Sequence, residues 1–250
     1  MKVTFNTSPS VIISRLSIVF VILSILNLMV QLSKYAFGYR EQWMFIFNMD
    51  REVNFPTLYT VLILYLCSFL IKHIRQSDYE QGKTNLLKYW KTLRYVFIYL
   101  ALDEALQIHE IFIIPDLGKQ LPGLFHFVWV VPYGLVALYF VNYFWKFVFL
   151  LPPKTRNNFI LSGAIYIGAA LGLEMVEGVW VRIAGGMQNL VYALISSVEE
   201  MLEIVAILLL INTLLNYIIK YNQEQEFSVE LNIVKDKVRA MRNEGHFSEQ

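Results

Sequence analysis

The sequence predicts an all-α membrane protein, a helical bundle with six transmembrane helices. Of the 250 residues, 56% are hydrophobic and 15% aromatic, whereas soluble domains are about 45–50% apolar. Six apolar stretches are long enough to cross a hydrocarbon core of ~30 Å at ~1.5 Å per residue. Lysine and arginine gather in alternate connections between these stretches, as the positive-inside rule describes. The net charge of +1 gives no reason to expect a nucleic-acid partner.

The predicted helices are runs of apolar residues that end at polar residues or at prolines. They cover residues 11–32, 56–74, 93–114, 127–151, 159–181 and 191–219. The first run is longer than the apolar part of a signal peptide and lacks a cleavage site of small residues, so we expect an uncleaved helix. Pro56 opens the second run, Pro115 follows the third, and Pro152 follows the fourth. Proline is tolerated at such helix ends because no helical hydrogen bond is lost there.

The fifth stretch, residues 159–181, is expected at the centre of the bundle. Ala164, Gly168 and Gly172 are spaced four residues apart, a pattern that lets transmembrane helices pack closely. Glu174 and Glu177 lie roughly on the opposite face. Both faces should therefore meet protein. The sixth stretch is the longest, and its acids lie in its first half.

The basic residues predict the orientation. Most of them lie in the connections after the second and fourth helices and after the sixth, so we expect both termini in the cytoplasm and the protein in the inner (plasma) membrane. Residues 1–220 would form the membrane domain, and residues 221–250 a polar cytoplasmic tail with a short amphipathic helix. The connection 33–55 is rich in aromatic residues, which is typical of an interfacial segment or of a lid over an outward-facing cavity.

Carboxylates inside the predicted membrane helices are the main functional signal. The eight acids are Asp103, Glu104, Glu110, Glu174, Glu177, Glu199, Glu200 and Glu203. A charged side chain near the bilayer centre costs at least ~2.5–3.5 kcal/mol, so acids in such places are candidates for function. The nearby basic groups are Arg182, His109 and His126. We therefore expect protons or metal ions to supply positive charge.

Helix geometry predicts that these acids form one layer between the midplane and the outer face. At ~100° per residue, Asp103 and Glu110 fall on one stripe of the third helix, which Glu104 and His109 flank. The two acids of the fifth helix share a face, and those of the sixth share an arc of about 100°. His126, at the start of the fourth helix, could cap the layer from outside. We expect one shared polar site rather than scattered carboxylates.

The donor types favour a divalent metal. Carboxylates with one or two imidazoles suit Fe, Mn or Zn, although the Glu-x-x-His pairs of helical di-iron sites are missing. The candidate metal ligands are Glu104, His109, Glu110, Glu174, Glu177, Glu200 and Glu203. Among them, Glu104, His109, Glu110 and Glu203 are the candidate catalytic acids and bases, while Asp103, Glu199 and His126 are expected around the ligands. Cys67 is the single cysteine, which excludes a thiolate metal site.

These residues support three hypotheses for the function. The first is a metal-dependent membrane enzyme, a hydrolase or an oxidoreductase, acting on a lipid-like or other hydrophobic substrate drawn from the membrane lipid. The second is a proton- or cation-coupled transporter. It is weakened because the inner half offers mainly Ser162, Asn212 and Thr213, and no inverted repeat is visible. The third is a structural or sensory protein in which protonated acids join the helices, a role for which eight acids are more than needed.

Several segments together resemble an uncharacterised family of bacterial polytopic membrane proteins. The matching segments are EVNFPT, ALDEALQIHE, GAALGLEMVE and VEEMLEI. The Leu-Asp-Glu-x4-His-Glu element at residues 102–110 is the most specific of them. The resemblance implies a membrane fold of six or seven helices and no particular activity. It also draws Glu52 and Asn54, at the outer end of the second helix, into the candidate site.

Overall fold

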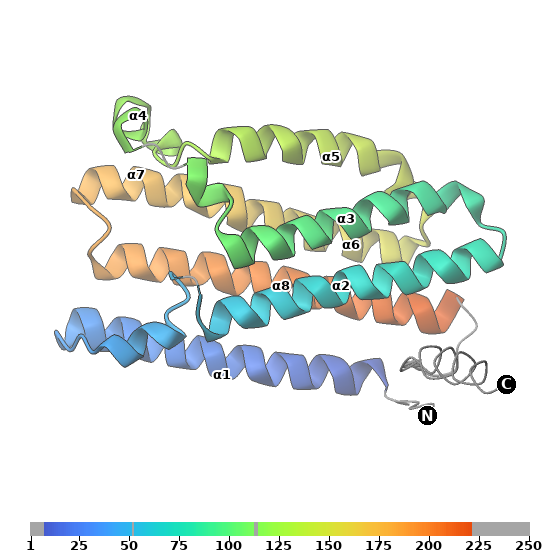
Figure 1. The fold of residues 1–250 in the computed structure, drawn as a ribbon, viewed down its shortest axis with the longest axis horizontal. Helices are drawn as coiled ribbons and strands as arrows, with labels where there is room; N and C mark the ends of the chain where they lie inside the picture. The colour runs from blue at the N-terminus through green and yellow to red at the C-terminus, as the bar shows by residue number, and fades with distance from the viewer. Residues whose placement is uncertain (1–7, 52, 113–114, 222–250) are drawn as a thin grey trace, which may run out of the picture.

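The described part of the chain is helical throughout. The computed structural model describes residues 8–51, 53–112 and 115–221, and within these ranges it contains no β-strand. Long helices lie side by side along one direction (Figure 1). The α-helices are α1 (Pro9–Ala36), α2 (Phe55–Glu80), α3 (Thr84–Leu106), α4 (Pro115–Gln120), α5 (Val130–Leu150), α6 (Pro153–Ile167), α7 (Glu174–Ala184) and α8 (Leu190–Tyr221). Three 3-10 helices are η1 (Gln42–Phe47), η2 (His109–Phe112) and η3 (Gly123–Phe125), and η4 (Gly168–Leu173) is a π-helix.

Five helical segments are long and apolar enough to cross a membrane. They are Pro9–Ala36, Phe55–Glu80, Val130–Leu150, Pro153–Ala184 and Leu190–Lys220. The third predicted crossing, α3, is not among them, since its 23 residues include three basic residues near the start and two acids near the end. The all-α prediction is thus confirmed for the described residues, and the spans indicate a membrane protein. The predicted amphipathic tail helix lies outside the described residues.

The predicted bounds of the third helix are wrong at both ends. The helix begins at Thr84 instead of residue 93, because Tyr89 and Trp90 face the core while lysines take the outer side. It ends at Leu106 instead of residue 114, because Gln107 adopts a left-handed conformation with φ of 56°. Asp103 and Glu104 therefore lie in the last turn and not at mid-helix. His109 and Glu110 come after it on η2, so the expected single helical stripe is broken.

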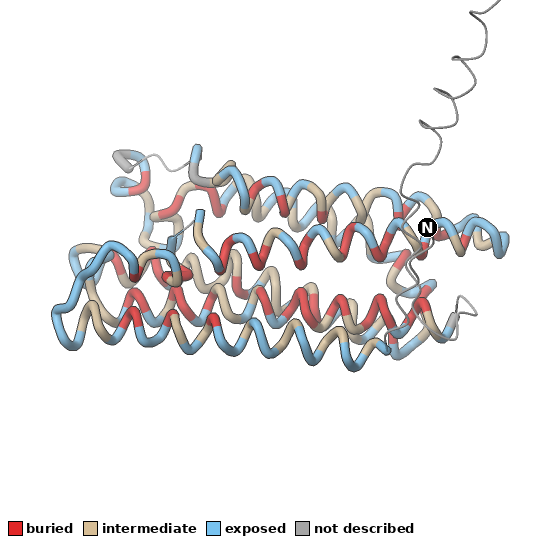
Figure 2. The backbone as a smooth tube through the Cα atoms, turned by 60° about the horizontal axis from the view of Figure 1, so that its bottom comes forward, coloured by how far each residue is buried: buried red, intermediate tan, exposed pale blue. Residues whose placement is uncertain are grey.

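The core lies between α2 and α8. Fully buried aliphatic side chains line both helices: Ile63, Leu64, Leu70, Ile71 and Ile74 on α2, and Ile204, Ile207, Ile211, Leu214 and Leu215 on α8. Figure 2 shows the buried residues facing the inside of the bundle and the exposed ones facing outward. By contrast, α1 and α5 expose many large apolar side chains. Such an outer surface suits a lipid environment.

The fifth predicted helix lies between α5 and α8 but is little buried, and Gly168 and Gly172 do not mediate close packing. It comprises α6, η4 and α7, and few of its side chains are buried. Beyond the neighbouring residues and backbone of their own helix, no atom lies within 4 Å of the position that a Cβ would take at Gly168 or Gly172. These glycines line a cavity or belong to the π-helix instead. A π turn holds an extra residue and rotates the next helical segment by about 100°, and Glu174 and Glu177 begin that segment, α7.

A buried acid fixes the hairpin of α2 and α3 against α8. Asp78 is 0% exposed. Its Oδ1 accepts a hydrogen bond from Lys83 Nζ at 3.2 Å, and its Oδ2 accepts from Trp90 Nε1 at 2.8 Å and from Tyr217 Oη at 3.4 Å. Lys83 lies in the connection, Trp90 on α3 and Tyr217 on α8. One carboxylate therefore joins three segments at this end of the bundle.

Candidate functional site

Seven of the eight acids predicted to form one layer line one large cavity. Its volume is about 1190 Å³, and its walls come from α3, α5, the α6–η4–α7 segment and α8. The acids that line it are Asp50, Asp103, Glu104, Glu174, Glu177, Glu199, Glu200 and Glu203, together with His109. No lysine or arginine of the described ranges lines it. The structure thus gathers the acids of three separate helices, as the sequence predicted.

Three glutamates approach one another most closely. Glu174, Glu177 and Glu199 each offer one carboxylate oxygen, and these oxygens lie within 4.8 Å of one another. Glu177 is 2% exposed and Glu199 is 7% exposed. Trp129 Nε1 donates a hydrogen bond to Glu174 Oε1 at 3.1 Å. Glu177 Oε1 is buried and has no hydrogen-bond partner within the described part of the chain. Such crowded acids repel one another unless they share protons or a cation.

The prediction placed Glu199 around the metal ligands, whereas the structure brings it into this trio. Glu200, which was predicted as a ligand, lines the same cavity outside the trio. Both residues lie on α8, one helical position apart. Because they share an arc of about 100°, helix geometry alone does not tell which of them approaches the acids of α7. Which of the two meets the acids of α7 depends on the rotation of α7 about its axis. The π-helix before α7 determines this rotation, and the sequence shows no clear sign of the π-helix.

A second polar cluster forms where α3 ends. Asp103 Oδ1 accepts hydrogen bonds from the backbone N–H of His109 and from Tyr133 Oη, both at 2.9 Å. His109 Nδ1 lies 3.5 Å from Asp103 Oδ2. Tyr99 and Tyr133 share a hydrogen bond of 2.7 Å between their hydroxyls. The left-handed turn at Gln107 makes this geometry possible by folding His109 back toward Asp103.

Trp129 connects the two clusters. Its indole N–H binds Glu174, and its ring lies 5.1 Å from the His109 ring, centroid to centroid. Tyr133, one turn further on α5, reaches Asp103. Sequence reasoning did not assign Trp129 or Tyr133 to the site. Their spacing of four residues at the start of a membrane helix was the available signal, because it places both on one face.

Asp50 is a further lining residue that was not predicted. Its Oδ1 accepts a hydrogen bond from Ser196 Oγ on α8 at 3.0 Å. A buried network holds its segment in place: Asn27 Nδ2 donates to Ser197 Oγ at 2.8 Å, and Asn27 Oδ1 accepts from the backbone N–H of Met49 at 3.0 Å. Met49 and Asp50 line the cavity. The connection after α1 therefore contributes two residues to the cavity wall.

Four predicted site residues are not seen to contribute. Asn54 caps α2, accepting from the backbone N–H of Thr57 at 3.0 Å, and it does not line the cavity. Glu52 and the side chain of Glu110 lie outside the described residues. His126 does not line the cavity either, and packs on Gly178 of α7, where a Cβ would meet His126 Cβ at 2.9 Å.

The environment of His126 gives a pH dependence that can be measured. Burial lowers the pKa of His126, and Arg182 and Lys119 lower it further. The unfolded chain, with the ordinary value of 6.5, then binds more protons below that pH, so stability is present above pH 6.5 and falls as the pH drops. We expect His126→Gln to flatten the decline in melting temperature between about pH 7 and pH 5. Wild type and variant share all carboxylates, so these contribute equally to the two pH profiles. An unchanged slope of melting temperature against pH would therefore contradict the lowered pKa of His126.

Fold and site together define an all-helical membrane protein with an acidic cavity between its helices. The chain belongs to the family described as "Domain of unknown function (DUF8692)", whose sequence model matches residues 16–217. This agrees with the resemblance to an uncharacterised family. The match includes both polar clusters. No curated protein and no solved structure matches the chain.

Proposed function

We propose that the protein is a metal-dependent membrane enzyme that acts on a lipid-like substrate. The observation that most supports the proposal is the trio Glu174, Glu177 and Glu199, with the buried Oε1 of Glu177 unpaired. Buried carboxylate oxygens without a hydrogen-bond partner are rare because their desolvation is costly. A divalent cation would neutralise the trio and satisfy the unpaired oxygen.

The spacing of the trio supports a metal. Metal–oxygen bonds of ~2.0–2.2 Å place two ligand oxygens at most ~4.4 Å apart. The oxygens lie within 4.8 Å, so small rotations of the side chains would bring them to bonding distance. Of the three candidate metals, a set of carboxylates alone best suits Mn²⁺. When bound, such an ion would polarise a substrate oxygen or activate a water molecule.

The second cluster is suited to proton transfer. Asp103 receives the His109 backbone N–H and lies beside the imidazole, an arrangement that orients a histidine as acid or base. Trp129 keeps that imidazole near Glu174. Glu104 and Glu203 line the same cavity and remain candidates for the same work. We assign His109 as the principal acid/base group and Asp103 as its positioning residue.

The rest of the cavity wall supports a hydrophobic substrate. Away from the acids, the lining is apolar, with Phe97 on α3, Phe140 and Phe144 on α5, and Ile207 on α8. Along α8 the lining runs from Tyr192 to Leu210, which corresponds to about 27 Å of helix. This is close to the ~30 Å thickness of the hydrocarbon core. An amphiphile with a long chain and a polar end at the carboxylates fits such a cavity.

The proposal includes the membrane arrangement. We propose that α3 is a sixth crossing, since it runs back along α2 after a short connection (Figure 1). Both termini would face the cytoplasm, because the basic residues gather at the helix ends that flank the α2–α3 and α5–α6 connections, and these lie on the same side as the termini. The inner membrane is the compartment that this orientation suits. The glutamate trio would then lie in the outer half of the bilayer.

Elemental analysis combined with lipid turnover tests the proposed function. We expect protein purified without chelator to hold about one equivalent of Mn, Fe or Zn, or to take it up on add-back. Metal-loaded protein in vesicles made from total membrane lipid should change the lipid profile seen by mass spectrometry, and His109→Gln should abolish the change while keeping the metal.

Two outcomes would overturn the proposal. Protein that takes up no stoichiometric metal from any of the three salts would exclude the metal site. A cation flux in proteoliposomes that disappears in Glu203→Gln, without lipid turnover, would instead support the transport hypothesis.

A further inference from the structure

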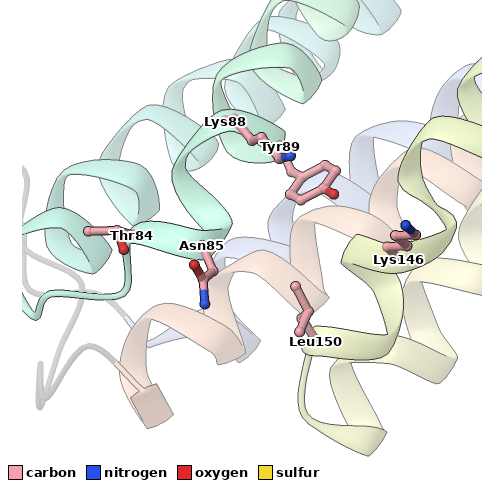
Figure 3. Close-up of a pocket in the computed structure, with 6 residues that line it drawn as sticks. All are labelled: Thr84, Asn85, Lys88, Tyr89, Lys146 and Leu150. Carbon is pink, nitrogen blue, oxygen red and sulfur yellow. The ribbon is translucent and has the colours of Figure 1, made fainter.

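A second pocket lies away from the acidic cavity, between the start of α3 and the end of α5. Its volume is about 500 Å³, and its lining residues are Thr84, Asn85, Lys88, Tyr89, Lys146 and Leu150. Figure 3 shows the α3 side chains on one side of the pocket and Lys146 and Leu150 of α5 on the other. Neither lysine lines the acidic cavity. The two pockets therefore share no charged residue.

The chemistry of this pocket is that of an anion site. Five of its six lining side chains carry an N–H or O–H donor, two of these are cationic, and no carboxylate lines the pocket. A phosphate group accepts several hydrogen bonds and carries the complementary charge, and Lys is a common phosphate-binding residue. The acidic cavity, lined by carboxylates, has the opposite preference.

The pocket has a rigid floor. Tyr89 is 8% exposed, and its ring stacks on Phe147 with centroids 5.3 Å apart and packs on Tyr143 at 5.4 Å. The ammonium of Lys88 lies 4.8 Å from the Tyr89 ring centroid. Since α5 carries Tyr143, Lys146 and Phe147, these ring contacts fix the part of α5 that bears Lys146 against the start of α3.

The neighbouring surface of α5 points to a lipid as the source of the phosphate. Trp145 is 60% exposed, Phe149 52% and Leu150 54%. Leu150 lines the pocket, whereas Trp145 and Phe149 lie within one turn of Lys146 on α5 and also line the acidic cavity. A phospholipid can bind such a surface, because its acyl chains pack along the apolar side chains and its anionic headgroup contacts the lysines near the helix end. A soluble phosphate would use the lysines alone.

We propose that this pocket binds the phosphate of an anionic phospholipid in the leaflet at the Lys88 end of the bundle. Lys88 and Lys146 contact the phosphate, Asn85 and Thr84 donate hydrogen bonds to it, and the acyl chains lie along the exposed apolar face of α5. The headgroup contacts use none of the cavity acids, so a loss of lipid binding and a loss of the proposed enzyme activity are distinguishable.

Thermal shift of the delipidated full-length protein in detergent tests this site. We expect phosphatidylglycerol to raise the melting temperature and phosphatidylcholine to leave it nearly unchanged. Each lysine near an anionic lipid surface contributes about fivefold in affinity, so Lys88→Gln/Lys146→Gln should weaken the apparent affinity for phosphatidylglycerol roughly thirty-fold. Both lysines are exposed, so the variant should fold.

The matched control is Lys91→Gln/Lys154→Gln. It removes the same charge from exposed lysines of the same end that do not line the pocket, and it should weaken the affinity far less. Equal losses in the two double variants would overturn the proposal, because they would show a response to total charge. Equal shifts with the two lipids, or the same shift with inorganic phosphate alone, would also overturn it.

Discussion

Glu177→Gln is expected to abolish metal binding at the glutamate trio. The substitution keeps the size of the side chain and removes one of three carboxylates whose oxygens lie within 4.8 Å. Changes to residues that only support metal ligands cost 10–100-fold in affinity, so losing a ligand should cost about 100-fold or more. Titration with Mn²⁺, followed by elemental analysis after desalting, measures this loss.

Glu200→Gln is the matched control for this variant. Glu200 lies on α8 next to Glu199 and lines the same cavity, but it is not in the trio. It loses the same charge, so the general electrostatic effect of the cavity is equal in both variants. We expect Glu200→Gln to retain stoichiometric metal. Equal losses of metal in the two variants would mean that the site is not the trio.

Glu177→Gln should stabilise the protein when no metal is bound. Glu177 is 2% exposed and close to two other carboxylates, so a neutral amide relieves repulsion and desolvation. We expect the melting temperature of metal-free Glu177→Gln to exceed that of wild type by roughly 2–4 °C, which corresponds to ~1 kcal/mol. If the acids only joined the helices through hydrogen bonds, metal would raise the melting temperature of neither protein.

The sequence was sufficient to find the apolar helices but not the start of α3. Crossing helices such as α1 and α8 are recognised because lipid exposure and core burial both require apolar residues. The first turns of α3 combine Tyr89 and Trp90 on the buried side with Lys88 and Lys91 on the other. That pattern reflects a helix end at the polar edge of the bundle. A search for continuous apolar runs therefore begins the helix too late.

The acids were predictable as a group, but their pairing was not. Charges in an apolar segment are visible in a sequence, and ideal helix geometry correctly placed most of them in one cavity. Two local departures from ideal geometry then decided which residues meet. The left-handed Gln107 brings His109 back to Asp103, and the π-helix η4 sets the face on which Glu177 lies. Hydrogen bonds between segments far apart in the sequence place Asp50 at the cavity, and no local sequence pattern predicts them.

Asp78→Leu is expected to destabilise the protein more than any surface change, by about 3–5 kcal/mol. The carboxylate is 0% exposed and accepts hydrogen bonds from Lys83, Trp90 and Tyr217. Leucine fills the space but leaves a buried indole N–H unpaired and removes the carboxylate that Lys83 contacts. At ~2–4 °C per kcal/mol, the melting temperature should fall by roughly 10 °C.

Two companion variants make this result interpretable. Glu80→Leu makes the same chemical change two residues further on, at an exposed side chain bonded to Gln76, and should shift stability by at most ~0.5 kcal/mol. Asp78→Asn keeps an acceptor for Trp90 and should fall between the two, which preserves the test if the leucine variant does not fold. Because α3 carries Asp103 at its other end, a hairpin loosened from α8 at Asp78 should also weaken metal-induced stabilisation. Equal losses at Asp78 and Glu80 would show that the buried carboxylate does not hold the hairpin in place.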